Sequence, residues 1–352
     1  MQDINSSNIQ KLESMISQAR KIAVVTHQKP DGDAMGSCTA LYHFLSLCGK
    51  DSIRIILNDR YPAYLDFIVS DIPDTDLLVF SERPLETGII LRDSDLIFCL
   101  DFNAFSRTDK LEPFLAGSKA EKVLIDHHLN PDRAAFDLSF SETDISSASE
   151  LLYNVLMSTS IIAQNAENLP LKACTALMTG MTTDTNNFSN STFPSTLLMA
   201  SDLLAAGVDR DEIISRIYNQ YGENRLRLLG HILKDLLVIT DDGVAYIVLD
   251  RNTQKKYSVA EGDTEGFVNM PLSIAGVRMS ILVKEDEGRI RVSIRSRRGT
   301  SANGCARQFF NGGGHENAAG GRLDVPKDIP GIEAADEYIE RHTHIYLNGD
   351  NE

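Results

Sequence analysis

Four short runs of apolar, mostly β-branched residues recur along the first half of the chain, at Lys21–Thr26, Ser52–Leu57, Asp95–Leu100 and Lys122–Ile125. Continuous apolar runs of this length are typical of parallel strands that are buried on both faces. Parallel strands need long crossover connections, and helical patterns such as Ala34–Cys48 lie between the runs. Another helix is predicted to begin at Ser147–Glu150, which has the spacing of a capping box. The pattern therefore predicts an α/β domain with a parallel sheet.

The pattern changes in the second half of the chain. Asp209–Asp235 has the apolar spacing of one or two helices. Strand patterns follow at Val244–Leu249, Met279–Val283 and Arg289–Arg295. The last one alternates charged and apolar residues, which predicts one buried face. We expect a catalytic domain at 1–205, a helical connector at 206–237 and a smaller α+β domain at 238–352, with an active-site cleft between the two domains.

The charge balance limits the partners of the chain. Its 352 residues include 34 Lys+Arg and 50 Asp+Glu, a formal net charge of −16. Stable binding to a long nucleic-acid duplex needs a broad cationic track, so this class of partner is excluded, whereas a small anionic substrate is not. No apolar segment approaches the roughly 20 residues that span a bilayer, so we expect no membrane partner. Five cysteines without a CxxC pair fit a reduced, cytoplasmic protein.

Three of the predicted strands end in residue types that bind metals. They are His27, Asp31 and Asp33 after the first strand, Asp101 after the third, and Asp126, His127 and His128 after the fourth. Ligands of open α/β sheets bind outside the carboxyl ends of the strands, so the fold would bring these side chains to one edge. Asp184, just after a helix predicted over Pro170–Met181, could add a further carboxylate.

The number of these side chains matters more than any one of them. A single Asp after a strand is most often a turn or cap residue. Five carboxylates and up to three histidines at one edge would repel and desolvate one another without a cation. An oxygen-rich set suits Mn²⁺ or Mg²⁺ better than Zn²⁺. So many ligands indicate two ions about 3.5–4 Å apart that share an activated water.

A glycine-rich segment, Asn311–Gly320, stands out in the second half. Glycines let backbone N–H groups approach an anion, and the N-terminus of a following helix would favour negative charge. A plain flexible hairpin is the alternative. Arg295 and Arg297 lie two apart on the preceding predicted strand, hence on one face. Cations beside a glycine turn in an acidic chain predict a phosphate site.

These motifs resemble those of one known family. Asp126-His127-His128 resembles the signature of the DHH phosphoesterase superfamily. Three other segments resemble further motifs of that family: His27–Ser37, Asp101 with Arg107 six residues later, and Gly180–Thr185. Gly312–Gly320 resembles the signature of the C-terminal domain that is associated with the family. The resemblance covers nearly the whole chain, in order. The two-domain form is most similar to the oligoribonuclease and pAp phosphatase group, the nanoRNases.

The resemblance also implies roles for individual residues. One metal would be held by His27, Asp31 and Asp101, and the second by Asp33, Asp101, His127 and Asp184. These ions would be Mn²⁺, with Mg²⁺ as an alternative. Asp126 would orient the histidines, and His128 would face the scissile phosphate or the leaving oxygen. Substrate phosphates would be held by Arg107, Arg295, Gly313, Gly314 and His315.

The resemblance implies a cytoplasmic exoribonuclease that hydrolyses short single-stranded RNA to 5′-mononucleotides and dephosphorylates pAp to AMP. Two departures from the family pattern concern specificity: Asn303-Gly304, where the family often has an Asp-Val pair, and Asn311, where a further glycine is common. One alternative is a soluble phosphodiesterase for cyclic-di-AMP or the linear dinucleotide pApA. Another is a nucleotide sensor without turnover, which the complete set of ligand types disfavours. Whether the chain forms a homodimer is left open.

Overall fold

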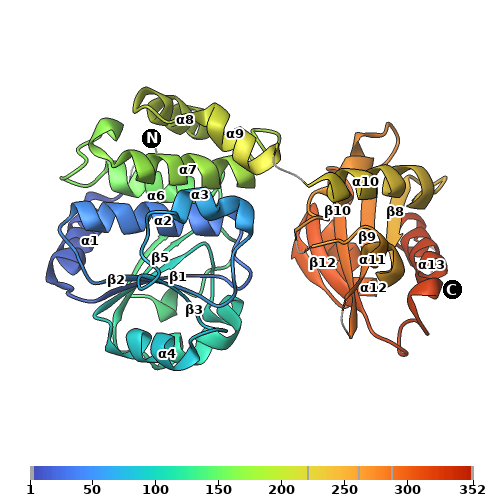
Figure 1. Cartoon of the computed structure of the whole chain (residues 1–352), viewed down its shortest axis with the longest axis horizontal. Coiled ribbons are helices and arrows are strands. Elements are labelled where there is room, and N and C mark those ends of the chain that lie inside the picture. The colour runs from blue at the N-terminus through green and yellow to red at the C-terminus, as the bar shows by residue number, and fades with distance from the viewer. Residues whose placement is uncertain (1–3, 220–221, 261, 287, 350–352) are drawn as a thin grey trace. The chain divides into compact units, whose positions relative to one another are not determined.

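The chain divides into two compact units, Met1–Gln220 and Tyr221–Glu352. The computed structural model describes residues 4–219, 222–260, 262–286 and 288–349 (Figure 1). In this part of the chain, none of the helices combines the length and the apolar run that crossing a membrane takes.

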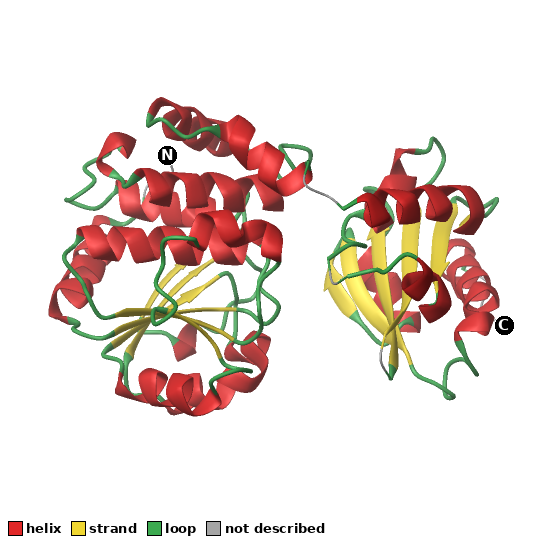
Figure 2. Ribbon diagram, in the orientation of Figure 1, coloured by secondary structure: helices red, strands yellow, loops and turns green. Residues whose placement is uncertain are grey.

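In the first unit, yellow strands form a sheet with red helices above and below it (Figure 2). The sheet has six parallel strands in the order β3-β2-β1-β4-β5-β6. Its strands are β1 Ile22–Thr26, β2 Ile53–Leu57, β3 Leu77–Val79, β4 Leu96–Leu100, β5 Glu121–Asp126 and β6 Leu138–Ser141. The chain winds from β1 outward to β3 and then from β4 outward to β6. The order therefore reverses between β1 and β4, which is where ligands bind in open α/β sheets.

Helices cover both faces of this sheet. They are α1 Ser6–Gln18, α2 Gly32–Leu47, α3 Asp66–Val69, α4 Pro84–Asp93, α5 Glu112–Gly117, α6 Ala148–Met157, α7 Leu171–Asp184, α8 Pro194–Ala205 and α9 Arg210–Tyr218. Short 3₁₀ segments include η1 Ala63–Leu65 and η2 Phe105–Leu111. Alternate residues of β1 enter two cores: Ile22 and Val24 pack with α1, α2, α6 and α7, whereas Ala23 and Val25 pack with α4 and α5. Burial on both faces explains the continuous apolar runs of the central strands.

The second unit is a smaller mixed sheet with the order β11-β12-β10-β9-β8-β7, in which only the β8–β9 pair is parallel. Its strands are β7 Leu237–Ile239, β8 Val244–Leu249, β9 Met279–Asp286, β10 Arg289–Ser296, β11 Gly313–His315 and β12 Ala318–Leu323. One face packs on α12 Ala302–Phe309 and α13 Ala335–Asn348. The other face packs partly on α10 Glu223–His231 and the 3₁₀ segment η6 Phe267–Ser273. A short helix, α11, spans Arg251–Lys256.

The predicted fold class is confirmed, with a parallel α/β sheet followed by a smaller α+β sheet. The predicted helices of segment 206–237 belong to different units. Ile213 and Ile217 of α9 enter the core of the first unit, whereas Leu228 of α10 enters a core of the second. The boundaries at 205 and 238, which separate a catalytic domain from a substrate-binding domain, stay a prediction.

Candidate metal centre

The topology brings the predicted metal ligands to one edge of the first sheet. His27 follows the last residue of β1, and Asp101 follows the last residue of the neighbouring strand β4. His127 and His128 follow β5, which pairs with β4 on the side away from β1. Parallel strands end at the same edge, so these side chains meet at the reversal of strand order.

Asp101 lies at the centre of this cluster. Its Oδ2 is 3.4 Å from His27 Nε2, and its Oδ1 is 3.4 Å from His127 Nε2. Two further carboxylates complete the two sides: Asp31 Oδ1 lies 3.9 Å from His27 Nε2, and Asp184 Oδ2 lies 3.6 Å from His127 Nε2. Asp101 therefore presents one oxygen to each histidine.

Three sets of side chains could each hold an ion, since their ligand atoms lie within 4.8 Å of one another. The sets are His27, Asp31 and Asp101; Asp33, His127 and Asp184; and Asp101, His127 and His128. Together they contain all six predicted metal ligands. The structure thus brings these residues together, as binding of two neighbouring ions would require.

The donor atoms also fit a cation. Asp101 is 3% exposed, and its Oδ1 has no hydrogen-bond partner among the described residues. A buried carboxylate oxygen without a donor is costly unless a cation compensates it. The backbone carbonyl of Gln28 lies 2.7 Å from His27 Nδ1. Since a carbonyl only accepts, Nδ1 carries a proton, and Nε2 can present its lone pair to a metal.

Crowding shifts the pKa values of these groups. Burial lowers the pKa of His27 and of His127, but the nearby Asp101 carboxylate outweighs it and raises them to about 9 and about 10. Burial and the charge of Asp101 raise the pKa of Asp33 to about 7, and burial together with the charge of Asp33 raises that of Asp184. Burial alone would raise the pKa of Asp101, yet His127 and His27 hold it well below its usual range. Without a cation, these raised pKa values favour protonated side chains at this centre.

Asp33 is held by the N-terminus of α6, a contact that the sequence analysis missed. Its Oδ2 accepts from the N–H of Ala148 at 2.6 Å, and its Oδ1 accepts from the N–H of Ser149 at 2.9 Å. Ser147 caps this helix by accepting from the N–H of Glu150, as the spacing predicts. The first N–H groups of a helix favour a negative charge, so α6 fixes the Asp33 carboxylate at the centre.

Gly180 of α7 is required by this arrangement. A methyl group at Gly180 would lie 2.0 Å from Ser149 Oγ and 2.9 Å from Asp33 Oδ1. The glycine therefore lets α7 pass close to the start of α6. Asp184 follows one turn later as the last residue of α7, so the prediction that the helix ends at Met181 is wrong.

Asp126 is fully buried and contacts His128. Its Oδ1 lies 2.7 Å from His128 Nδ1, and its Oδ2 accepts from the His128 N–H at 3.1 Å. These two contacts fix both the ring and the backbone of His128. Arg107, on η2, accepts from the Gln28 N–H through its carbonyl at 2.8 Å. Its segment thus lies against the loop that carries His27.

Several residues with a strained backbone lie in the loops at this edge. Non-glycine residues with positive φ follow β1 at Lys29, β4 at Asp101, and β5 at Asn130, and three more follow α7 at Asn186–Phe188. Such conformations cost of order 1–3 kcal/mol each and cluster at functional sites. The strain adds support for a functional centre at this edge.

The second unit gathers the other predicted residues around a hairpin. His315 of β11 is in register with Ala318 of β12, which is in register with Arg295 of β10. Arg295 is half-buried and donates to the carbonyls of Ile294 at 3.0 Å and Ala319 at 3.5 Å. Burial lowers its pKa. Its Nη1 is therefore directed into the sheet.

Two expectations about this region are wrong. Strand β12, not a helix, follows the glycine turn. Arg297 lies beyond the end of β10 and donates to the carbonyls of Leu272 at 2.6 Å and Ile274 at 3.3 Å. It does not share a strand face with Arg295.

Close strand packing explains most of the glycines in the hairpin. A methyl group at Gly312 would lie 2.0 Å from the carbonyl oxygen of Gly320, and one at Gly314 would lie 2.5 Å from that of Ala318. Gly314 also has φ +158. These two positions therefore need glycine for the fold itself.

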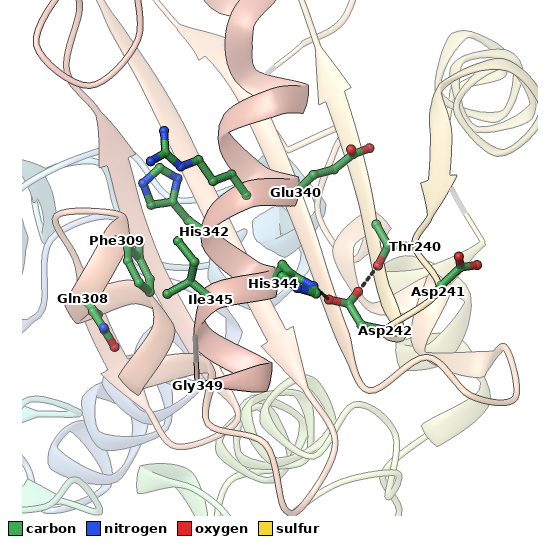
Figure 3. Close-up of a pocket in the computed structure, with 11 residues that line it drawn as sticks. Thr240, Asp241, Asp242, Gln308, Phe309, Glu340, His342, His344, Ile345 and Gly349 are labelled. Atoms are coloured by element: carbon green, nitrogen blue, oxygen red, sulfur yellow. Dashed lines mark hydrogen bonds and ion pairs between the residues drawn. The ribbon is translucent and has the colours of Figure 1, made fainter. Parts of the chain in front are cut away.

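A groove of about 1240 Å³ elsewhere in the second unit has a different character (Figure 3). It is lined by α13, the end of α12 and the turn before β8, which carries Asp241 and Asp242. His344 points to Asp242, with Nδ1 and Oδ2 3.2 Å apart. Glu340 adds a third carboxylate to this lining, and Arg341 adds a cation. The described lining includes none of the predicted site residues.

Comparisons with known proteins find a known domain in each unit. The DHH family, N-terminal domain, matches residues 21–181, and the DHHA1 domain matches residues 241–341. The crystal structure of an exopolyphosphatase-related protein from Bacteroides fragilis is 34% identical with a TM-score of 0.91, and the match covers 99% of this chain and 98% of that one.

Two enzymes show weaker similarity. The bifunctional oligoribonuclease and PAP phosphatase NrnA of Bacillus subtilis is 28% identical over 84% of this chain and 87% of its own length. The cyclic-di-AMP phosphodiesterase GdpP of Geobacillus thermodenitrificans is 22% identical over 96% of this chain but only 49% of its own length. With both family domains present and a 34% identical relative matched over almost its whole length, the chain belongs to the DHH family of phosphoesterases.

Proposed function

We propose that this protein is a metal-dependent phosphodiesterase that hydrolyses short RNA oligonucleotides to 5′-mononucleotides and pAp to AMP. The observation that carries the proposal is the position of Asp101, whose two oxygens face His27 and His127 and whose Oδ1 lacks a donor among the described residues. Mn²⁺ is the proposed metal, with Mg²⁺ as the alternative, because the ligand set is rich in oxygen.

The residues of the centre would divide the chemistry among them. Two bound cations would polarise the phosphoryl oxygens and lower the pKa of a shared water. His27 and His127 would offer Nε2 to the ions, and Asp101 would offer one oxygen to each. The N-terminus of α6 would keep Asp33 in place. His128, fixed by Asp126, would face the scissile phosphate or the leaving oxygen.

Arg107, Arg295, Gly313, Gly314 and His315 are proposed to hold other phosphates of the substrate. The net charge of −16 supports short substrates, because each added nucleotide brings a charge that meets little compensation. The similarity to NrnA, a bifunctional oligoribonuclease and PAP phosphatase, supports both activities. A cytoplasmic location is part of the proposal, supported by five free cysteines.

A second candidate is hydrolysis of cyclic-di-AMP or of its linear product pApA. The GdpP relative supports it, since 96% of this chain matches that protein. Both candidates would use the same metal chemistry, so only the substrate separates them.

One panel assay tests the proposal. Purified protein with Mn²⁺ would be given pAp, ApA, pApA, RNAs of increasing length and cyclic-di-AMP, and the products would be separated by chromatography. We expect turnover of pAp and of the shortest RNAs, with rates that fall as length grows. Faster hydrolysis of cyclic-di-AMP than of any linear substrate would favour the second candidate. No turnover of any of them, with metal bound, would refute both.

A further inference from the structure

Glu150 of α6 is a fully buried carboxylate to which the proposed chemistry gives no role. One of its oxygens, Oε2, accepts from three donors: the Ser146 N–H at 3.2 Å, the Ser146 hydroxyl at 2.5 Å and the Thr196 hydroxyl at 2.7 Å. The other oxygen, Oε1, has no hydrogen-bond partner among the described residues. A buried carboxylate is costly, so a position that carries one is a candidate for a specific role.

An ordinary capping box explains only part of this arrangement. Ser147 caps α6 by accepting from the Glu150 N–H at 3.0 Å, as the spacing of these two residues predicts. The Glu150 side chain, however, reaches past the cap residue to Ser146. It also binds Thr196, the third residue of α8, which lies 46 positions away in the chain. Glu150 therefore links the start of α6 to the start of α8.

One side of this link leads to Asp33. The N–H groups of Ala148 and Ser149 hold the Asp33 carboxylate, and these two residues lie between Ser146 and Glu150 in the chain. Because Glu150 binds both the N–H and the hydroxyl of Ser146, it closes the first turn of α6 around the two N–H groups. Glu150 thus supports the direction in which they point at the metal centre.

The other side of the link leads to the segment that follows Asp184. This segment runs from the end of α7 to Phe193, the residue before α8. The Phe193 N–H donates to Thr196 Oγ1 at 3.1 Å, and the Thr196 hydroxyl donates in turn to Glu150. Near its start, the segment contains three residues with positive φ, Asn186–Phe188. Surrounding structure has to hold such conformations, and the contact with Glu150 anchors the far end of the segment.

We infer that Glu150 is a positioning residue for one of the two metal ions, the ion whose candidate ligands are Asp33, His127 and Asp184. It supports two of these three ligands, Asp33 through α6 and Asp184 through the segment before α8. Neither route from Glu150 ends at the ion beside His27, so its loss should weaken the binding of one ion more than that of the other. This inference rests on the metal centre of the proposed function.

Calorimetric titration with Mn²⁺ tests the inference, because it requires no turnover. Two reference variants identify the binding steps: Asp33→Asn removes a ligand of one ion, and Asp31→Asn removes a ligand of the other. Glu150→Ala should weaken the step that Asp33→Asn affects by roughly ten- to a hundredfold, which is typical of losing an outer contact to a metal ligand. The step that Asp31→Asn affects should change far less.

Substitutions of a hydroxyl donor test the same link without removing a buried carboxylate, and so they decide the matter even if Glu150→Ala does not fold. Thr196→Val keeps the shape but loses the donor, and it should weaken the same step about two- to tenfold, as loss of one hydrogen bond would. Thr196→Ser keeps the hydroxyl and should restore the affinity. Glu150→Gln should restore most of it as well, because its carbonyl oxygen can accept from the same donors.

Ser158→Ala is the matched control. The Ser158 hydroxyl donates to the Asn154 carbonyl at 2.9 Å at the other end of α6, so this variant also loses one helix hydrogen bond, but away from the metal centre. Both binding steps should then equal those of wild type.

Selective weakening of one step in Glu150→Ala and in Thr196→Val would support the inference. Equal weakening of both steps would mean that Glu150 serves the fold as a whole, and unchanged binding would mean that it positions no ligand; either result would overturn the inference. Turnover tests the proposed function separately. If wild type binds Mn²⁺ in two steps but hydrolyses no substrate of the panel, the proposed function fails, and the role of Glu150 is still decided by the titrations.

Discussion

The metal edge of the first unit and the glycine hairpin of the second differ in how their polar groups are satisfied. At the metal edge, a buried oxygen of Asp101 lacks a donor, and the pKa values of Asp33 and His127 are raised. At the hairpin, Arg295 donates to carbonyls, and Asn303 accepts from Gly314. The first region has a buried oxygen that a cation would satisfy, whereas the polar groups named at the hairpin already have partners within the protein.

The comparison predicts that losing a shared ligand has the largest effect. Asp101→Ala should lower kcat/KM at least about a thousandfold, because metal ions stabilise the transition state by several kcal/mol. Rates and metal content by mass spectrometry would be measured together, with Asp132→Ala, an exposed residue after β5, as the control. Full turnover of wild type in excess chelator would refute the metal-dependent chemistry.

The second prediction concerns the support of Asp33. Gly180→Ala would push its methyl group into Ser149 and so displace the start of α6 from the carboxylate. Loss of such outer contacts typically costs ten- to a hundredfold in metal affinity or activity. Gly117→Ala, at the end of α5 where a methyl group meets nothing within 4 Å, is the matched control. Equal metal affinity in both variants would show that α6 does not position Asp33.

The third prediction concerns the hairpin. His315→Ala should lower kcat/KM on a dinucleotide roughly ten- to a hundredfold, because one charge-assisted hydrogen bond to a remote phosphate is lost. Its metal content should equal that of wild type. Activity on bis(p-nitrophenyl) phosphate, which has no end phosphate, should fall far less. A loss of metal in this variant would contradict the division of roles between the two regions.

The sequence predicts the metal edge better than the hairpin for a physical reason. The central strands β1, β4 and β5 are buried on both faces, so they appear as continuous apolar runs, and the metal ligands follow directly after them. The sheet-edge strands β3 and β6 have three and four residues, which is too short for a period to show. They were missed.

The hairpin lacks such a signal. Strand β12 reads Ala-Ala-Gly-Gly-Arg-Leu, without a β-branched residue, and forms because β10 and β11 pair with it. Contacts between segments that lie far apart in the chain also have no local signal in the sequence. The support of Asp33 by Ala148 spans 115 positions. In both cases the tertiary packing decides the role.

The last prediction follows from the protons held at the metal edge. His27 and His127, with pKa values of about 9 and about 10, are charged at pH 7.5 in the metal-free protein, and each must release a proton to offer Nε2 to an ion. Because these pKa values are raised, Mn²⁺ affinity should rise with pH from 6 to 9, by about tenfold per unit for each proton released. Calorimetric titrations in buffers of different ionisation enthalpy would count the protons. His43, whose pKa is lowered by burial and which lies outside the cluster, should add nothing, so His43→Gln is the control. Binding that releases no protons and does not change with pH would mean that these histidines are not ligands, and the metal edge would then resemble the hairpin in being complete on its own.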